Sequence, residues 1–249
     1  MTPARDLYVD LLLRCVVDGI YGEPMPGPWW PGNKFDRGER VSGTLGPTTA
    51  HTMVGVDRLN NLRDLTQAVL DEGIPGNLIE TGVWRGGCCI LMRGMLAASG
   101  EAGRKVYVAD SFMGVPPPKP ELYPADRDDT LYRHRELAVP LDVVKANFAR
   151  YGLLDDQVVF VEGWFSDTLP SLDCGALALM RLDGDLYEST HLALEHLHPK
   201  LSPGGFVIID DYGVSAGCRE AVADYRGRHG IVAPIHEIDR SGVWWRRPA

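Results

Sequence analysis

Short apolar runs alternate with segments of helical spacing over most of the chain. Five of these runs have the length of strands, at 77–80, 106–110, 158–161, 176–180 and 206–209. Nearly continuous apolar strands separated by helices are typical of a parallel sheet that is covered by helices on both faces. Two further runs, 235–238 and 243–245, flank Ser241-Gly242 and predict a terminal antiparallel hairpin. The pattern therefore predicts an α/β fold with a doubly wound, mostly parallel seven-stranded sheet.

The N-terminal part of the chain lacks this alternation. Apolar side chains at helical spacing predict an amphipathic helix over residues 5–20. Residues 22–47 are rich in glycine and proline and carry Trp29 and Trp30, which predicts a long ordered arm. Because tryptophans in such an arm favour packing against a ligand or a second subunit, we expect a homo-oligomer.

A second interruption falls between the second strand and the helix that follows it. Residues 112–140 contain a triple proline and a charged stretch, and we interpret them as an inserted flap. The expected organisation is an N-terminal helix and arm over 1–50 and one domain over 51–249, with the flap at about 112–140.

Composition limits the class of protein. With 249 residues, 45% of them hydrophobic, the chain can bury the core of one large domain. A formal net charge of −9 argues against a nucleic-acid partner, because phosphate binding needs a basic face. The start has no basic-then-apolar leader, and no apolar run approaches the roughly 20 residues that span a bilayer. We therefore expect a cytoplasmic protein without a membrane partner, in which the five cysteines are reduced thiols.

The first strand runs into a glycine-rich turn, Glu80-Thr81-Gly82-Val83-Trp84-Arg85-Gly86-Gly87. Its glycines at 82 and 86 allow the backbone to approach a ligand closely and the next helix to start. A dinucleotide fingerprint would have a glycine where Trp84 stands. The turn therefore disfavours a pyrophosphate-containing cofactor, and with it a nicotinamide-dependent oxidoreductase.

Residues at three strand ends suit a cofactor without phosphate. Ligands of doubly wound sheets bind beyond the carboxyl ends of the strands. There Glu80 can accept from an ammonium group, Asp110 can accept from both hydroxyls of a ribose, and Gly163-Trp164 can border an adenine ring. Each acid alone is better explained as an ordinary polar strand end. The ordered set favours S-adenosylmethionine.

Four aspartates follow the fourth and fifth strands. Asp183 and Asp185 flank a glycine just after one strand, and Asp210-Asp211 ends the next. Asp183, Asp210 and Asp211 could supply three oxygen ligands to Mg²⁺, with water and a substrate diol completing the shell. Helix N-capping is the alternative for Asp185, which precedes a predicted helix. Two adjacent carboxylates are harder to explain by capping, because packing them together without a cation raises a pKa.

The acceptor group decides how much help the reaction needs. An alcohol hydroxyl has a pKa near ~15.7 and an aspartic acid near ~3.9, a gap of about 12 units that costs roughly 16 kcal/mol if the proton moves first. A divalent ion lowers the hydroxyl pKa, so Asp185 beside the ion is the predicted general base. A phenol ionises near ~10 and needs less help, which keeps a catechol-type O-methyltransferase as an alternative. A non-catalytic binding module would have no need of four clustered carboxylates.

These segments together resemble the macrocin O-methyltransferase (TylF-like) family, whose members methylate sugar hydroxyls in antibiotic biosynthesis. The resemblance extends over nearly the whole chain. It is carried by the segments 51–55, 80–87, 108–112, 163–165, 181–187, 202–205 and 210–212. It implies the Rossmann-like class I methyltransferase fold, with S-adenosylmethionine and Mg²⁺ as cofactors.

The resemblance also implies roles for individual residues. The general base falls on Asp185, and the metal ligands fall on Asp183, Asp210 and Asp211. The implied cofactor contacts are Met53, Val54, Glu80, Thr81, Gly82, Gly86, Asp110, Ser111, Gly163, Trp164 and Asp183. Met53 and Val54 match a segment that closes over the cofactor.

The expected activity is methylation of a hydroxyl of a deoxysugar that bears a vicinal diol. The acceptor is a small molecule, in which the sugar is either nucleotide-linked or already attached to a natural product. In the flap, His134 and Glu136 could assist binding or catalysis, or could belong to a solvated helix face.

Overall fold

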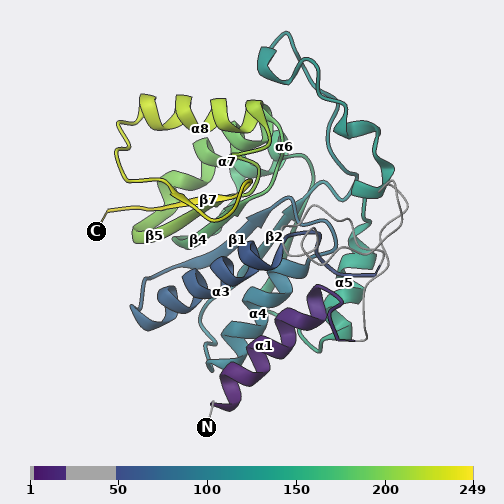
Figure 1. Cartoon of the computed structure of the whole chain (residues 1–249), viewed down its shortest axis with the longest axis vertical. Coiled ribbons are helices and arrows are strands. Elements are labelled where there is room, and N and C mark those ends of the chain that lie inside the picture. The colour runs from purple at the N-terminus through teal and green to yellow at the C-terminus, as the bar shows by residue number, and fades with distance from the viewer. Residues whose placement is uncertain (1–2, 21–48, 249) are drawn as a thin grey trace.

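The computed structural model describes residues 3–20 and 49–248, and its centre is a single sheet (Figure 1). Seven strands lie in the order β3-β2-β1-β4-β5-β7-β6. Their bounds are β1 Asn77–Thr81, β2 Val106–Asp110, β3 Val158–Glu162, β4 Leu177–Leu182, β5 Leu201–Ile209, β6 His236–Glu237 and β7 Val243–Arg246. Strands β1 to β5 pair in parallel, whereas β7 is antiparallel to β5 and to β6. The predicted parallel sheet with a terminal antiparallel pair is confirmed.

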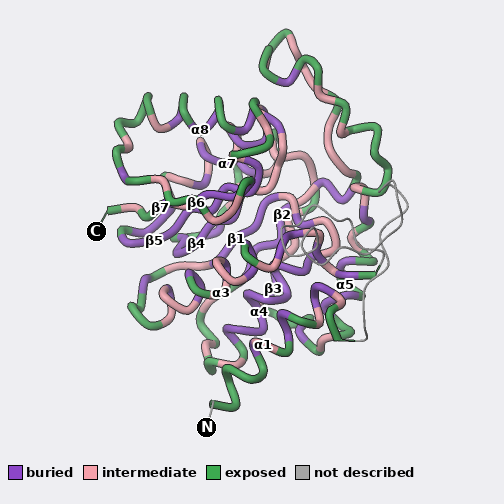
Figure 2. Tube along the Cα trace, viewed as in Figure 1, coloured by how far each residue is buried: buried purple, intermediate pink, exposed green. Residues whose placement is uncertain are grey.

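Helices cover both faces of the sheet, which gives three layers (Figure 1). One face is covered by α3 Val56–Asp71, α4 Gly87–Ala98 and α5 Leu141–Arg150, and α1 Ala4–Val16 packs on the outer side of α4. The other packs against α6 Phe165–Thr168, α7 Tyr187–Leu197 and α8 Ala216–Arg228. Within β5, Phe206 and Ile208 point into the first core, and Val207 and Ile209 point into the second. The central strands β1, β2, β4 and β5 are mostly apolar because both of their faces are buried (Figure 2).

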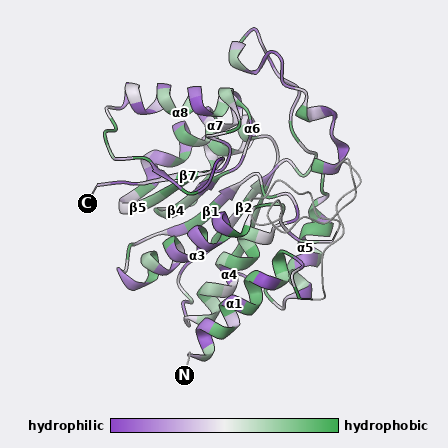
Figure 3. Cartoon of the chain, in the orientation of Figure 1, coloured by the Kyte–Doolittle hydropathy of each residue, from purple (hydrophilic) through white to green (hydrophobic). Residues whose placement is uncertain are grey.

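Helix α4 lies between the sheet and α1 and is mostly hydrophobic, with Arg93 as its one charged residue (Figure 3). Ten consecutive residues, from Gly87 to Leu96, are buried. Gly94 lets α1 approach closely, because a Cβ at this position would overlap the side chain of Leu12. The glycine turn after β1 is therefore continuous with the most deeply buried helix of the domain.

Helix α3 is an element that the sequence analysis did not predict. Its buried face carries Leu59, Leu62, Leu65 and Val69, which are at helical spacing and would have indicated it. The omission matters because α3 also carries Arg58, a buried residue of the site described below.

Of the two predicted irregular segments, the arm and the flap, the structure describes only the flap. The predicted arm over 22–47, with Trp29 and Trp30, lies outside the described residues, so the homo-oligomer and the domain boundary at residue 50 stay predictions. The flap departs from strand–helix alternation as expected (Figure 1). It contains three short 3₁₀ turns, η1 Pro124–Asp126, η2 Leu131–Arg133 and η3 Arg135–Leu137. None of the helices in the described parts of the chain has the length and apolar character needed to cross a membrane.

Candidate active site

One cavity of about 1010 Å³ opens at the carboxyl ends of the central strands. It is bordered by the glycine turn after β1, the ends of β2, β4 and β5, and the flap. Most of the residues expected at the site line it: Met53, Val54, Glu80, Gly82, Asp110, Ser111, Trp164, Asp183, Asp185, Asp210 and Asp211. The expected cofactor end and the expected metal end therefore share one space.

Three expected cofactor residues do not line the cavity, and their contacts are structural. Thr81 is buried in β1. Gly86 has φ +86°, and a Cβ there would lie 2.9 Å from the side chain of Val144 on α5. Gly163 has φ +138° and would meet Thr168 in the same way. These two glycines shape the turns beneath the cavity wall.

Gly82 joins the ends of three strands. Its N–H donates to the carbonyl of Ala109 on β2 at 2.9 Å, and Asp183 N–H donates to the carbonyl of Thr81 at 2.9 Å. Its φ is +81°, and a Cβ would overlap the carbonyl oxygen of Asp183. A side chain at position 82 would therefore push apart the cofactor turn and the turn that carries the aspartates.

We expect Gly82→Ala to destabilise the protein by more than about 2 kcal/mol, since it adds a steric overlap to the cost of a positive φ. Gly73→Ala is the matched control. Gly73 also has a positive φ (+63°), but nothing lies within 4 Å of its added Cβ, so it measures the conformational cost alone. Urea unfolding of both variants checks this, and equal losses of stability would contradict the proposed contact.

Asp110 is held in place by backbone donors. Its Oδ2 accepts from Val83 N–H and its Oδ1 from Phe112 N–H, each at 2.7 Å. Burial raises the pKa of this carboxyl, and the hydrogen bonds partly oppose the rise. Because each carboxylate oxygen has a second lone pair, Asp110 can accept further hydrogen bonds from a ligand.

A buried arginine connects the two ends of the cavity, and the sequence analysis gave it no role. Arg181 on β4 is 1% exposed and pairs with Glu80 at 2.5 Å, with Asp183 at 2.8 Å, and with Asp210. The second oxygen of Glu80 accepts from the thiol of Cys89 at 2.9 Å. Burial raises the pKa of Glu80 to about 7, against the lowering effect of Arg181.

Asp210 is surrounded by positive charge. Besides Arg181 it pairs with Arg58 of α3, which also pairs with Asp239 at 3.0 Å. The adjacent aspartates were expected to need a cation, and guanidinium groups supply that charge for Asp210. That Asp210 binds magnesium therefore stays a prediction. The two arginines would compete with the ion for its oxygens.

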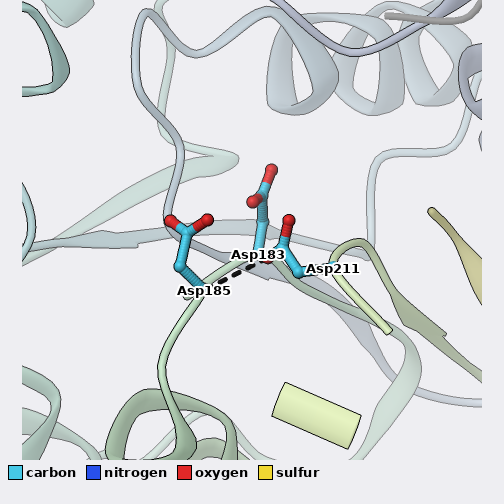
Figure 4. A group of neighbouring side chains, drawn as sticks. All are labelled: Asp183, Asp185 and Asp211. Carbon is cyan, nitrogen blue, oxygen red and sulfur yellow. Dashed lines mark hydrogen bonds between the residues drawn. The ribbon is translucent and has the colours of Figure 1, made fainter. Parts of the chain in front are cut away.

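Three of the four carboxylates bring their oxygens close together. Asp183, Asp185 and Asp211 each offer an oxygen within 4.8 Å of the others, and the side chains lie together (Figure 4). Asp185 N–H donates to Asp211 Oδ2 at 3.1 Å. Burial and neighbouring negative charges raise the pKa of Asp183 to about 6 and that of Asp185 to about 8, and they also raise the pKa of Asp211. This repulsion is the environment that a divalent cation would relieve.

Asp185 does not cap the helix that follows it. The N-cap of α7 is Leu186, and the first helical amides, Tyr187 N–H and Glu188 N–H, donate to Asp126 of the flap. Asp185 has φ +59°, a conformation that few residues other than glycine, asparagine and aspartate adopt. The capping alternative is therefore wrong for Asp185.

The two flap residues differ in position. His134 lines the cavity, whereas Glu136 does not, and only the backbone carbonyl of Glu136 contacts the site, as the acceptor for Trp84 Nε1–H at 3.0 Å. Both residues are exposed and belong to 3₁₀ turns and their borders rather than to a continuous helix face.

The sequence matches a known family over almost its full length. A family model described as macrocin-O-methyltransferase (TylF) matches residues 8–247. The chain is 54% identical over 247 residues to 8-demethyl-8-(2,3-dimethoxy-alpha-L-rhamnosyl)-tetracenomycin-C 4'-O-methyltransferase from Streptomyces olivaceus, covering 99% of this chain and 94% of the relative. It is 49% identical to mycinamicin III 3''-O-methyltransferase from Micromonospora griseorubida, with all of both chains covered.

Solved structures give the same result. The O-methyltransferase NovP superposes with a TM-score of 0.93 at 44% identity, covering 98% of this chain and 100% of that chain. The calicheamicin methyltransferase CalS11 matches with a TM-score of 0.62 at 22% identity, over 99% and 93% of the two chains, which supports the fold alone. These matches support neither of the two disfavoured alternatives, an oxidoreductase or a binding module. The chain belongs to the macrocin-O-methyltransferase (TylF) family and is an O-methyltransferase with the Rossmann-like class I fold.

Proposed function

We propose that this protein transfers the methyl group of S-adenosylmethionine to a sugar hydroxyl, with Mg²⁺ at the carboxylate group. The observation that carries the proposal is the single cavity into which both Asp110 and the group of Asp183, Asp185 and Asp211 open. Relatives named as sugar methyltransferases of antibiotic compounds support the acceptor class, and one of these names contains a rhamnosyl group.

S-adenosylmethionine supplies an electrophilic methyl group on sulfur. Asp110, fixed by two backbone amides, accepts the ribose hydroxyls, and Trp164 borders the adenine. Glu80, held by Arg181 and Cys89, accepts from the amino group of the methionine part, directly or through ordered water. The tryptophan in the glycine turn disfavours the close pyrophosphate contact that a nicotinamide cofactor requires.

The carboxylate group fits a hard cation, since its donors are oxygens that lie within reach of one ion. We assign Asp183 and Asp211 to the ion, and Asp210 stays an expected third ligand. A bound Mg²⁺ would lower the pKa of an acceptor hydroxyl beside it. Asp185, which lies beside Asp183 and Asp211, takes the proton of that hydroxyl.

The lining of the flap side favours an uncharged acceptor. The flap contributes mostly apolar residues to this lining, Val115, Pro116, Pro117, Pro118, Leu131 and Leu137, and Leu192 of α7 and Val214 after β5 add to them. Among the described residues of the lining, the lysines and arginines are Arg58, Lys119 and Arg240, and the first two already pair with carboxylates. A nucleoside diphosphate sugar would need more free positive charge for its phosphates. We therefore propose a sugar already attached to an uncharged natural product.

Calorimetry with S-adenosylmethionine and with NADH tests the cofactor. We expect micromolar or tighter binding of the first and none of the second, and the reverse would overturn the proposal. A panel of matched acceptors then tests the sugar, with each deoxysugar offered as a glycoside and as its nucleoside diphosphate. Methylation of a phenolic aglycone with no methylation of any sugar would favour the catechol-type alternative.

A further inference from the structure

We propose that Asp126 is a positioning residue. It fixes the flap relative to the turn after β4 that carries Asp183 and Asp185, which we call the aspartate turn. The inference deepens the proposed function, because it assigns the aspartate turn to proton transfer and the flap to the acceptor. It concerns a residue outside the cofactor and metal sites, and it starts from a contact between segments that are about sixty positions apart.

Asp126 lies at the end of η1 and is 3% exposed. Its Oδ1 accepts from Tyr187 N–H at 2.6 Å, and its Oδ2 accepts from Glu188 N–H at 3.0 Å. The first amides of a helix have no partner within the helix, and Leu186 has no side-chain acceptor to offer them. The flap therefore supplies the cap that α7 lacks in its own sequence.

Helix α8 has a glycine where it packs against the carboxylate of Asp126. Gly217 of α8 faces Asp126, and a Cβ there would lie 2.7 Å from its Oδ1 and 3.1 Å from Tyr187 N. The small residue allows flap, α7 and α8 to meet at one point. Asp126 is thus enclosed by packing and is not a surface acid that touches a helix end by chance.

Two further flap residues contact the same turn of α7. Lys119 Nζ pairs with Glu188 Oε1 at 2.6 Å, and the rings of Tyr123 and Tyr187 lie 5.9 Å apart. We call Lys119, Tyr123 and Asp126 the flap clasp. All three members contact Tyr187 or Glu188, so the flap is anchored to the first turn of α7.

This first turn of α7 follows the aspartate turn directly in the chain. Tyr187 is two positions after Asp185, and the turn between them is tight, with Leu186 N–H donating to Gly184 carbonyl at 2.6 Å. The amide fixed by Asp126 therefore sets where the turn ends. On the flap side, Lys119 follows Pro116-Pro117-Pro118, which line the cavity. One contact thus holds a wall of the acceptor space at a fixed place relative to the proposed base.

Asp126→Asn tests this role. The amide keeps the size of the carboxylate but has only one acceptor oxygen, so one of the two helix amides loses its partner. We expect the acceptor kcat/KM to fall about tenfold or more, because methyl transfer depends on sub-ångström alignment. The dissociation constant for S-adenosylmethionine should stay within about twofold of wild type. Asp128→Asn, an exposed change on the same flap, is the control and should leave both quantities unchanged.

Hydrogen exchange gives a readout that does not depend on activity. In ligand-free Asp126→Asn, the amides of Tyr187 and Glu188 should exchange faster, while those of β1 and β4 keep their protection. Lys119→Gln, which loosens the flap but leaves the cap, should raise the acceptor KM without changing exchange at Tyr187. Unchanged exchange in Asp126→Asn would overturn the positioning role, whichever acceptor the enzyme uses. An equal loss of cofactor affinity and of kcat/KM would also overturn it, since it would indicate general damage to the fold.

Discussion

Asp185→Asn is expected to lower kcat by about 10²–10⁴-fold, the usual contribution of a general base, with the affinity for S-adenosylmethionine unchanged. Asparagine has the shape of aspartate and tolerates the positive φ of this position. Its backbone N–H can still donate to Asp211, as Asp185 does at 3.1 Å. The variant therefore removes the proton acceptor and little else.

The variant also separates two roles that Asp185 could have in the carboxylate group. If Asp185 is the base, Mg²⁺ affinity should change much less than kcat. If Asp185 is chiefly a ligand, calorimetry should show Mg²⁺ affinity falling as far as kcat. Activity near the wild-type level on a sugar acceptor would exclude Asp185 as the base. On a phenolic acceptor the loss should be smaller, because a phenol ionises near ~10.

Removal of divalent cations is expected to reduce the rate to background, and added Mg²⁺ should restore it. An alcohol hydroxyl ionises near ~15.7, which is far above even the raised pKa of Asp185, about 8, so the carboxylate alone cannot take the proton first. Asp211→Asn should weaken Mg²⁺ binding by at least about tenfold. Asp210→Asn should lower stability as well as Mg²⁺ affinity, since it removes the charged partner of Arg58 and Arg181 together with an expected ligand. A chelator-resistant rate would contradict the metal assignment.

The stability of the folded protein should depend on pH in a way that reveals the same bound cation. The folded pKa values of Asp183, about 6, and Asp185, about 8, lie above the ~3.9 of an unfolded aspartate. A raised carboxylate pKa contributes stability that is present below about pH 4 and lost as the pH rises through the folded values. Cation-free protein should therefore lose stability between about pH 4 and 8. Mg²⁺ should raise Tm more at about pH 8 than at about pH 6, because it replaces the protons that are lost.

The features predicted well from sequence are those with a local signal. The central parallel strands are apolar runs that lead into acidic residues, so the mostly parallel sheet and the edge at which Asp110, Asp183 and Asp211 meet could be predicted from the chain alone. The glycine turn was recognised in the same way, because Gly82 needs a backbone conformation that other residues avoid. The family resemblance added Met53 and Val54, which line the cavity and which no local pattern indicates.

The features that were missed depend on contacts between distant segments. Arg58, Arg181 and Asp210 form ion pairs that connect α3, β4 and the end of β5. A single arginine in an apolar strand gives no sign of which acids it will meet. The cap on α7 comes from Asp126, and the nearby Asp185 was the natural candidate when only the sequence was considered. Pairings of this kind are set by packing in three dimensions.

Transfer of a labelled methyl group tests the central claim most directly. The assay would contain methyl-labelled S-adenosylmethionine and an uncharged rhamnosyl glycoside with neighbouring free hydroxyls, with Mg²⁺ or with a chelator. We predict that label appears on a sugar oxygen in the presence of Mg²⁺ and only at background level with chelator. Label on the sugar at the same rate in both conditions, or no label on the sugar in either with a phenol methylated instead, would contradict the account.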